Sequence, residues 1–310
     1  MAAYRICAED RRLFKRCRRQ WDFAASVRGN RQPRRPPQPS PAPGEALAGA
    51  LGKALDVYYY PGMWEWPRHI VVPLVHKAVD EALPPGPLLD ASHRLVIAYA
   101  EWAPAHDRLT PVQVALNIEV SVPDPVIADR GLTSASGDEV RYRAEIDVLA
   151  LDGDNRPWLM FHRFGPFCDP AVLPLDEEAL TACWAYEDFS LYRRVAGAVF
   201  TEVRWEDGAG AFRRTEVPYS RGEIEGAGRQ LGAESLLMVD VGLVVYPSPS
   251  PEHCGACAFR SPCLAVRAGA DPAPVLEAGY EERPEPTLME GRLGGGTWSM
   301  NRGARPPRFH

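Results

Sequence analysis

Hydrophobic and polar residues follow two different periods along this chain. Up to about residue 106, apolar residues recur every three or four positions, which is typical of helices. From residue 112 they recur at every second position within runs rich in β-branched and aromatic residues, which is typical of strands. The pattern predicts helices at 8–28, 45–60, 67–83, 91–106, 176–197 and 221–238, and strands at 112–122, 140–151, 157–164, 199–206 and 208–219. Helices and strands mixed in this way predict an α/β protein.

Prolines and polar stretches divide the chain further. The segment "NRQPRRPPQPSPAPG" (30–44) cannot be helical, because proline lacks the amide hydrogen and disfavours helix in the residue before it. We therefore expect a basic helix at 1–29, a proline-rich linker at 30–44 and a core at 45–250. A cysteine-containing segment at 251–270 and a poorly ordered tail at 271–310 complete the expected organisation.

Composition places the chain among ordinary globular proteins. Its 310 residues are 45% hydrophobic and 25% charged, and the net charge is −6. The apolar run "SLLMVDVGLVVYP" is too short to span a bilayer and contains Asp240. The start "MAAYRICAEDRRLFKRC" lacks the apolar core of a secretory signal. We therefore expect a cytoplasmic protein with no membrane partner.

The charge is distributed unevenly along the chain. Residues 1–35 contain eleven Arg or Lys residues against three acidic residues, a balance of +8, which leaves −14 for the remainder. A basic segment on an acidic body suits DNA or RNA, with Arg11, Arg12, Arg18 and Arg19 as candidate contacts. The alternative is a solvated arm with no nucleic-acid partner.

Three cysteines lie within ten positions in "PEHCGACAFRSPC" (251–263). Cys254, Cys257 and Cys263 have the spacing Cys-x2-Cys-x5-Cys, and the chain has seven cysteines in all. Because no export signal is evident, a disulfide framework is not expected, and closely spaced thiols in a reducing compartment indicate a metal site. A four-coordinate thiolate centre needs one more cysteine.

Cys17 is the best candidate for that fourth ligand. It lies in "FKRCRRQWDF", where cationic neighbours favour the thiolate form that binds metal. Cys183 lies among apolar residues of a helix and is expected to be a small buried side chain. Cys7 and Cys168 have no feature that favours them. Four thiolates suit either zinc or a [4Fe–4S] cluster.

Together these cysteine motifs resemble the iron–sulfur branch of the PD-(D/E)XK nuclease superfamily. That branch includes the RecB- and AddB-like helicase nucleases and the CRISPR-associated iron–sulfur exonucleases. The resemblance extends over residues 5–268 and implies a restriction-endonuclease-like core, in which helices flank a mixed central sheet. It also implies that Cys17, Cys254, Cys257 and Cys263 hold a [4Fe–4S] cluster that joins the two ends of the chain, with zinc as the alternative.

Part of the family's catalytic pattern is present. The family has a helical Gly-x-x-x-His, a Glu on an early strand, and Gly-x-Ile-Asp on the next strand. A hairpin then leads to (Asp/Glu)-x-Lys, and the following helix carries Gln-x-x-x-Tyr. The resemblance assigns Gly52 to the helical glycine, Glu119 to the early-strand glutamate, Asp147 to the aspartate and Tyr186 to the tyrosine.

Other positions of the pattern have changed. Asp56 stands at the histidine position, Phe161 at the carboxylate, Arg163 at the lysine and Ala182 at the glutamine. Residues 161 and 163 project from one face of a strand, so that His162 points the other way and cannot replace the missing ligand. The guanidinium of Arg163 stays protonated and cannot act as a general base.

We therefore expect a catalytically degenerate copy, because Mg²⁺ or Mn²⁺ would lack the oxygen ligands that it requires. In such a copy, Glu119, Asp147 and Arg163 are expected to form an internal ion pair where the metal was. The alternative is a rearranged acidic site made of Asp56, Glu119, Glu145 and Asp147.

Three functions follow as hypotheses. The first is an iron–sulfur PD-(D/E)XK-fold module that binds nucleic acid, or serves as a scaffold, without cutting. The second is an active metal-dependent DNA exonuclease or endonuclease with rearranged ligands. The third is a protein-interaction subunit that does not bind nucleic acid.

Overall fold

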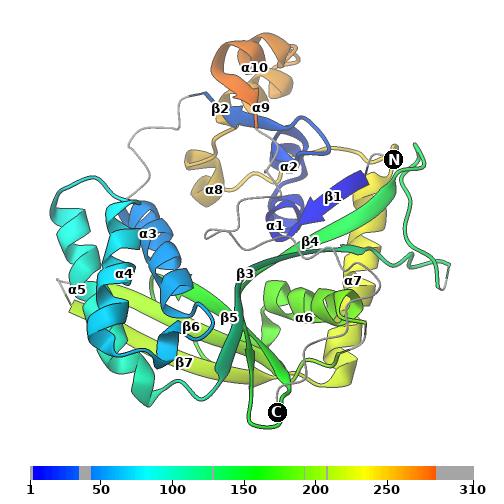
Figure 1. Ribbon diagram of the computed structural model, residues 1–310. Helices are drawn as coiled ribbons and strands as arrows, with labels where there is room; N and C mark the ends of the chain where they lie inside the picture. Colours follow the sequence, from blue (N-terminus) through cyan, green and yellow to red (C-terminus); the bar gives the residue numbers. More distant parts are fainter. Residues whose placement is uncertain (1–2, 35–42, 128, 192, 207–208, 284–310) are drawn as a thin grey trace.

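A mixed β-sheet forms the centre of the molecule (Figure 1). The computed structural model describes residues 3–34, 43–127, 129–191, 193–206 and 209–283. The strands of the central sheet are β1 (Ala3–Cys7), β3 (Thr110–Ser121), β4 (Glu139–Leu151), β5 (Pro157–Phe164), β6 (Gly197–Glu206) and β7 (Ala209–Pro218). Their order is β1-β4-β5-β6-β7, with β3 on the other edge of β4. The β1–β4 and β5–β6 pairs are parallel and the others antiparallel.

Helices cover both faces of this sheet. The helices of the described residues are α1 (Ala8–Arg16), α2 (Arg18–Ala24), α3 (Pro43–Tyr58), α4 (Arg68–Asp80), α5 (Pro87–Trp102), α6 (Glu177–Phe189), α7 (Arg221–Val239), α8 (Pro251–Gly255), α9 (Arg260–Arg267) and α10 (Ala273–Gly279). Helices α3, α4 and α5 pack on one face, and α6 and α7 pack on the other. The expected α/β fold with a mixed sheet flanked by helices is confirmed. Among the helices of the described ranges, none is long and apolar enough to cross a membrane.

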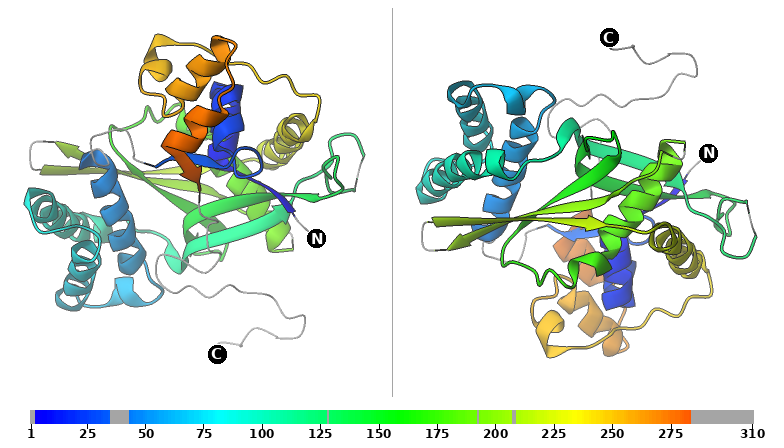
Figure 2. Two further views of the ribbon diagram at one scale, coloured as in Figure 1. Left: turned by 90° about the horizontal axis from the view of Figure 1, so that it is seen from above. Right: turned by 90° about the horizontal axis from the view of Figure 1, so that it is seen from below.

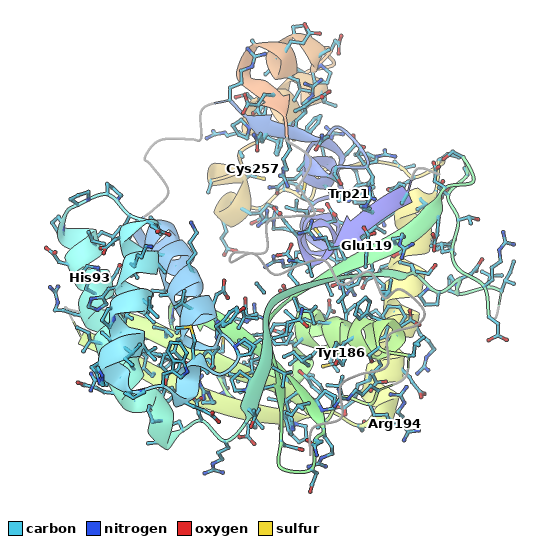
Figure 3. All side chains as sticks on the ribbon, in the orientation of Figure 1. Trp21, His93, Glu119, Tyr186, Arg194 and Cys257 are labelled. Carbon is cyan, nitrogen blue, oxygen red and sulfur yellow. The ribbon has the colours of Figure 1, made fainter. Side chains whose placement is uncertain are left out.

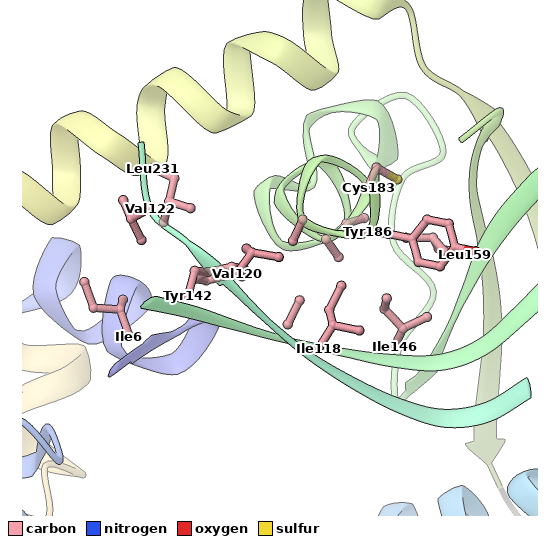
Figure 4. Packing of buried hydrophobic residues seen from close by; sticks show 14 of the residues in the cluster. Ile6, Ile118, Val120, Val122, Tyr142, Ile146, Leu159, Cys183, Tyr186 and Leu231 are labelled. Carbon is pink, nitrogen blue, oxygen red and sulfur yellow. The ribbon is translucent and has the colours of Figure 1, made fainter. Parts of the chain in front are cut away.

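Because successive side chains of a strand point to opposite faces of the sheet, one strand can contribute residues to both hydrophobic cores. In β5, Trp158 and Met160 belong to the α3-side core, whereas Leu159 and Phe161 belong to the α6-side core. The strand is therefore continuously apolar, as expected for a strand buried on both faces. Figure 4 shows the α6-side core, where Ile146 and Leu159 of the sheet face Tyr186 of α6.

The alternation changes in the middle of β4. Ile146 belongs to the α6-side core and Val148 to the α3-side core, although residues two apart normally share a face. On the neighbouring strand β3, Ala115 has a positive φ of 49°, which is uncommon for a residue other than glycine. Strand β1 pairs with residues 139–143 of β4 and β5 with residues 148–151, so Asp147 lies where the two pairings leave a gap.

The expected helix at 8–28 is divided at Cys17. Its backbone is extended (φ −161°, ψ 106°), so that α1 ends before it and α2 begins after it. The amide of Cys17 still donates to the carbonyl of Leu13 (2.8 Å), and the amide of Trp21 donates to the carbonyl of Cys17 (3.0 Å). No proline or glycine marks this break, so the sequence pattern gave no sign of it.

Segments from the N-terminal and C-terminal parts of the described chain lie side by side, with β2 next to α9 and α10 in Figures 1 and 2. Strand β2 (Arg31–Pro33) pairs antiparallel with β8 (Tyr280–Glu282). The rings of Phe23, Phe259 and Tyr280 stack in series, with centroid separations of 5.7 and 5.2 Å. The prediction of a proline-rich linker at 30–44 is therefore wrong for residues 31–33, which form β2, and for residues 43–44, which begin α3. The prediction of a poorly ordered tail from 271 is wrong for α10 and for β8, which pairs with β2. The remaining parts of both predictions, at 35–42 and 284–310, lie outside the described residues.

Candidate metal centre and the cleft beside β4

The structure brings Cys17, Cys254, Cys257 and Cys263 together around one cavity. The cavity has a volume of about 450 Å³, and all four side chains line it. Figure 3 marks Cys257 beside the N-terminal helices. The cysteine from the first helical segment therefore lies with the three from residues 251–263, as the fourth-ligand prediction requires.

Short local structures place each sulfur. Cys17 lies at the junction of α1 and α2, Cys254 in α8, Cys257 in the turn after α8, and Cys263 in α9. The amide of Ser250 donates to the Sγ atom of Cys254 (3.4 Å). Burial raises the pKa of the Cys257 thiol, and the nearby sulfurs of the other three cysteines raise it further. The four sulfurs are thus close enough to influence one another electrostatically.

The four cysteines supply the sulfur donors that a thiolate-ligated centre would need. Within the described part of the chain, no three His, Cys, Asp or Glu side chains are arranged to hold a single metal ion. Cys7 and Cys183 lie elsewhere. The Sγ atom of Cys7 donates to Asp10 (3.2 Å), and Cys183 is buried in the α6-side core, where desolvation raises its pKa. The expectation that Cys183 is a small buried side chain is confirmed.

The residues at the family's catalytic positions are dispersed. Asp56 and Asp147 line one cleft of about 220 Å³, together with Glu145, Arg143 and Asn117. The Asp147 Oδ2 atom accepts the backbone amide of His162 (2.7 Å) at the point where β4 and β5 cease to pair. This carboxylate therefore replaces a hydrogen bond of the sheet.

Glu119 and Arg163 have other partners. The Glu119 carboxylate accepts from Arg5 (2.7 Å) and lies 3.6 Å from Arg141. Figure 3 marks Glu119 on β3, on the side of the N-terminal segment. Arg163 donates to Asp176 (2.8 Å) at the start of α6. The expected ion pair among Glu119, Asp147 and Arg163 is therefore wrong, because the sheet directs Arg163 towards α6 and Glu119 towards β1.

Phe161 and His162 project as the alternation predicted. Phe161 is buried against Phe200, with ring centroids 6.0 Å apart, in the α6-side core. His162 lies on the other face and stacks on Tyr59, which directly follows α3, with ring centroids 5.7 Å apart. Ala182 is buried in α6, near Tyr186, whose pKa is raised by burial. The position to which the resemblance assigns a metal-binding carboxylate is thus part of the hydrophobic core.

The four arginines proposed for nucleic acid do not form one surface. Arg11 is 4% exposed, and its guanidinium binds Glu234 (2.6 Å) and Thr181 (2.7 Å). Burial in an ion pair removes Arg11 from the predicted contacts. Arg12 is exposed beside a smaller cavity next to Arg143.

Arg18 and Arg19 lie closer to the cysteines. The guanidinium of Arg18 lies over the rings of Phe14 (5.1 Å) and Tyr246 (4.9 Å). Arg19 lines the cysteine cavity, and its backbone amide donates to the carbonyl of Tyr246 (3.2 Å). These two arginines therefore remain candidates for a nucleic-acid contact.

Two groups of residues were missed from sequence. Behind His162, the Arg214 guanidinium donates to the hydroxyls of Tyr59 (2.5 Å) and Tyr99 (2.9 Å) and pairs with Asp107. The sequence offered no signal for this buried cluster, because its members come from four separate segments. Arg260 and Arg267 were also missed, although they flank Cys263 within α9.

Comparisons with known proteins assign no family. No family model matches the chain, and no curated protein matches it. Among solved structures, one described as "Crystal structure of SSO0001" aligns with a TM-score of 0.36 and 9% sequence identity. The alignment covers 84% of this chain and 85% of that one. A likeness at this level assigns neither a family nor a function.

Proposed function

We propose that this chain is an iron–sulfur protein of the PD-(D/E)XK type that binds nucleic acid and has lost nuclease activity. The observation that carries the proposal is the single cavity lined by Cys17, Cys254, Cys257 and Cys263. The element order supports the same assignment. Helix α3 is followed, after α4 and α5, by β3, β4, the hairpin strand β5 and then α6, in the order in which the family pattern places its motifs.

The resemblance to the iron–sulfur branch favours a [4Fe–4S] cluster over a single zinc ion. Zinc would be held by four sulfurs, each about 2.3 Å away. The four cysteines line a cavity of about 450 Å³, and metal analysis of the purified protein distinguishes the two groups. A [4Fe–4S] cluster would supply electron transfer or a rigid link between chain segments.

The dispersed catalytic positions support loss of nuclease activity. Magnesium-dependent hydrolysis needs several oxygen ligands and a group that activates water. The lysine position is an arginine bound to Asp176, and the second carboxylate position is the buried Phe161. Asp147 is already engaged with the amide of His162. The cleft therefore contains carboxylates, but the lysine and the second carboxylate of the family pattern are replaced by Arg163 and Phe161.

Anaerobic purification tests the metal centre. We expect a brown protein with broad visible absorbance and about four iron and four sulfide per chain. A colourless preparation with one zinc per chain would assign zinc instead. Neither metal bound would reject the centre altogether.

A nuclease assay tests the second part of the proposal. The cluster-loaded protein is incubated with labelled single- and double-stranded DNA and with Mg²⁺ or Mn²⁺, and we expect no cleavage. The second candidate function is an active nuclease, which is favoured by the shared position of Asp56, Glu145 and Asp147 in one cleft. Metal-dependent cleavage that Asp147→Ala abolishes would establish that candidate. Failure to bind any nucleic acid at low salt would favour the protein-interaction subunit.

A further inference from the structure

The rim of the cysteine cavity is strongly cationic. Arg19, His253, Arg260 and Arg267 line the cavity beside the four cysteines. None of the lining residues is an aspartate or glutamate, although the whole chain carries a net charge of −6. The protein as a whole is therefore acidic, whereas the residues that line this cavity include arginines and no carboxylate.

The three arginines of this rim lack the carboxylate partners that many other arginines of the described residues have. No carboxylate of the described residues lies within 4.0 Å of Arg19, Arg260 or Arg267, whereas Arg11 and Arg213 bind the carboxylates of Glu234 and Glu202. Arg260 and Arg267 are exposed, and they are the first and last residues of α9. Seven residues is close to two helical turns, so both side chains lie on the same face of α9.

A cluster accounts for only part of this charge. A [4Fe–4S] centre with four thiolates is an anion, and nearby cations stabilise it. An exposed guanidinium at each end of α9 is also positioned to reach an external anion. Arginines without a carboxylate partner beside a cavity suit phosphate oxygens, which a guanidinium binds through two parallel hydrogen bonds. The guanidinium of Arg19 also donates to the carbonyl of Val245 (3.4 Å).

We propose that Arg19, Arg260 and Arg267 form a binding site for the phosphodiester backbone of single-stranded nucleic acid, on the rim of the metal centre. This inference rests on the proposed function and gives its nucleic-acid contact a location. Single strands are favoured because Tyr246 is 47% exposed beside Arg19. The Arg18 guanidinium lies 4.9 Å from the centre of its ring, and the exposed part of the ring can stack on a base. Leu264, 53% exposed within α9, adds apolar surface at the same rim.

The site combines both ends of the chain. Arg19 follows Cys17 in α2, while Arg260 and Arg267 flank Cys263 in α9. These segments come together through the pairing of β2 with β8 and the stacked rings of Phe23, Phe259 and Tyr280, and the proposed metal centre would join them further. Binding of nucleic acid therefore depends on closure of the chain ends.

The experiment compares charge removal at the rim with charge removal elsewhere. Binding of a fluorescein-labelled oligothymidylate of about 20 nucleotides, and of a duplex of similar length, is measured by anisotropy across a KCl series. The rim variant is Arg260→Ala with Arg267→Ala. The matched control is Arg94→Ala with Arg229→Ala, two exposed arginines on α5 and α7 that change the net charge equally. Iron content and visible absorbance are recorded for every variant.

We expect the rim variant to keep its iron and to lower the salt dependence of single-strand binding by about 1.4, or about 0.7 per lost phosphate contact. The control should match the wild type. Replacement of both rim arginines by lysine should restore most of the salt dependence, because lysine also neutralises a phosphate.

Three outcomes would overturn the inference. Equal salt dependence in the rim and control variants would place the contact elsewhere. Loss of iron from the rim variant with unchanged binding would show that these arginines serve only the cluster. Tighter binding to the duplex than to the single strand would reject the ligand class. By contrast, a wild-type protein that binds neither probe at low salt would reject the nucleic-acid part of the proposed function as well.

Discussion

The cysteine cavity and the cleft beside β4 differ in how separation along the sequence relates to proximity in the fold. Cys17 and Cys263 are far apart in the chain, yet they line the same cavity. Asp147, Phe161 and Arg163 lie within one hairpin, yet they make contacts in different places. The comparison shows that residues form one site when they share a surface in the fold, whatever their separation in the sequence.

The physical cause differs between the two regions. In the hairpin, alternation and the gap between β4 and β5 fix where each side chain points, and burial of Phe161 adds a hydrophobic contact that a metal site would not tolerate. At the cavity, the β2–β8 pair and the stacked rings of Phe23, Phe259 and Tyr280 hold the chain ends together through protein contacts. These protein contacts join the two segments whether or not a metal is bound.

The largest expected effect is at the cavity. Cys17→Ser removes one of four thiolates, and we expect nearly complete loss of bound iron, because a cluster of this type needs four cysteine ligands. Cys168→Ser, at an exposed cysteine outside the cavity, is the matched control and should keep the full iron content. The measurement is iron and sulfide per chain after anaerobic purification. Wild-type iron in Cys17→Ser would show that another residue provides the fourth ligand.

A smaller but still severe effect is expected in the hairpin. Phe161→Asp restores the family's residue type, and it should lower the free energy of unfolding by at least about 3–5 kcal/mol, the range for Phe→Ala in a core. Burial of the new carboxylate adds to that loss. Urea denaturation measures the change, with Val126→Asp at a 77% exposed loop position as the control. A stable variant that gains metal-dependent cleavage would contradict our account of the cleft.

Within the cleft, Asp147 and Glu145 should differ. Asp147→Ala leaves the amide of His162 without its acceptor, and we expect a loss of about 1–3 kcal/mol in unfolding free energy. Glu145→Ala, at an exposed carboxylate on the same strand, should change it by less than about 0.5 kcal/mol. Denaturation curves of the two variants provide the comparison. Equal stability of the two variants would mean that the hydrogen bond from the His162 amide to Asp147 does not contribute to the free energy of unfolding.

The smallest expected effect is at Glu119. Its partner Arg5 is about half exposed, with a side-chain exposure of 49%, so that water and salt screen the pair. Glu119→Gln should therefore cost about 0.2–1 kcal/mol, and less in high salt. Unfolding at two salt concentrations measures the difference. A loss of several kcal/mol that persists in high salt would indicate a role beyond this surface pair.

Much of the fold could be predicted from sequence. Strands β3 to β7 and helices α3 to α7 follow from alternation and helical periodicity, because each buries an apolar face within a few residues of its own sequence. The first strand β1 was missed, since its five residues precede a longer helical pattern. Strands β2 and β8 were missed because neither has a local signal, and each exists through the other.

The candidate site was only partly predictable. The spacing of Cys254, Cys257 and Cys263 indicated a metal centre, and the basic surroundings of Cys17 selected the fourth ligand. The opposite projection of Phe161 and His162 followed from alternation in β5. The partners of Glu119 and Arg163 did not follow, because Arg5 and Asp176 belong to other segments and reach these side chains only in the folded sheet.

The sequence by itself determined which residue types were available: four cysteines that could bind a metal, and an arginine where the resembled family has a lysine. It determined them because chemistry is a property of single side chains and short spacings. Only the tertiary structure decided that Arg260 and Arg267 join Arg19 at one rim, and that Arg11 is buried. These groupings depend on how distant segments pack. The free energy of packing is shared among many residues, so no single residue of the sequence indicates it.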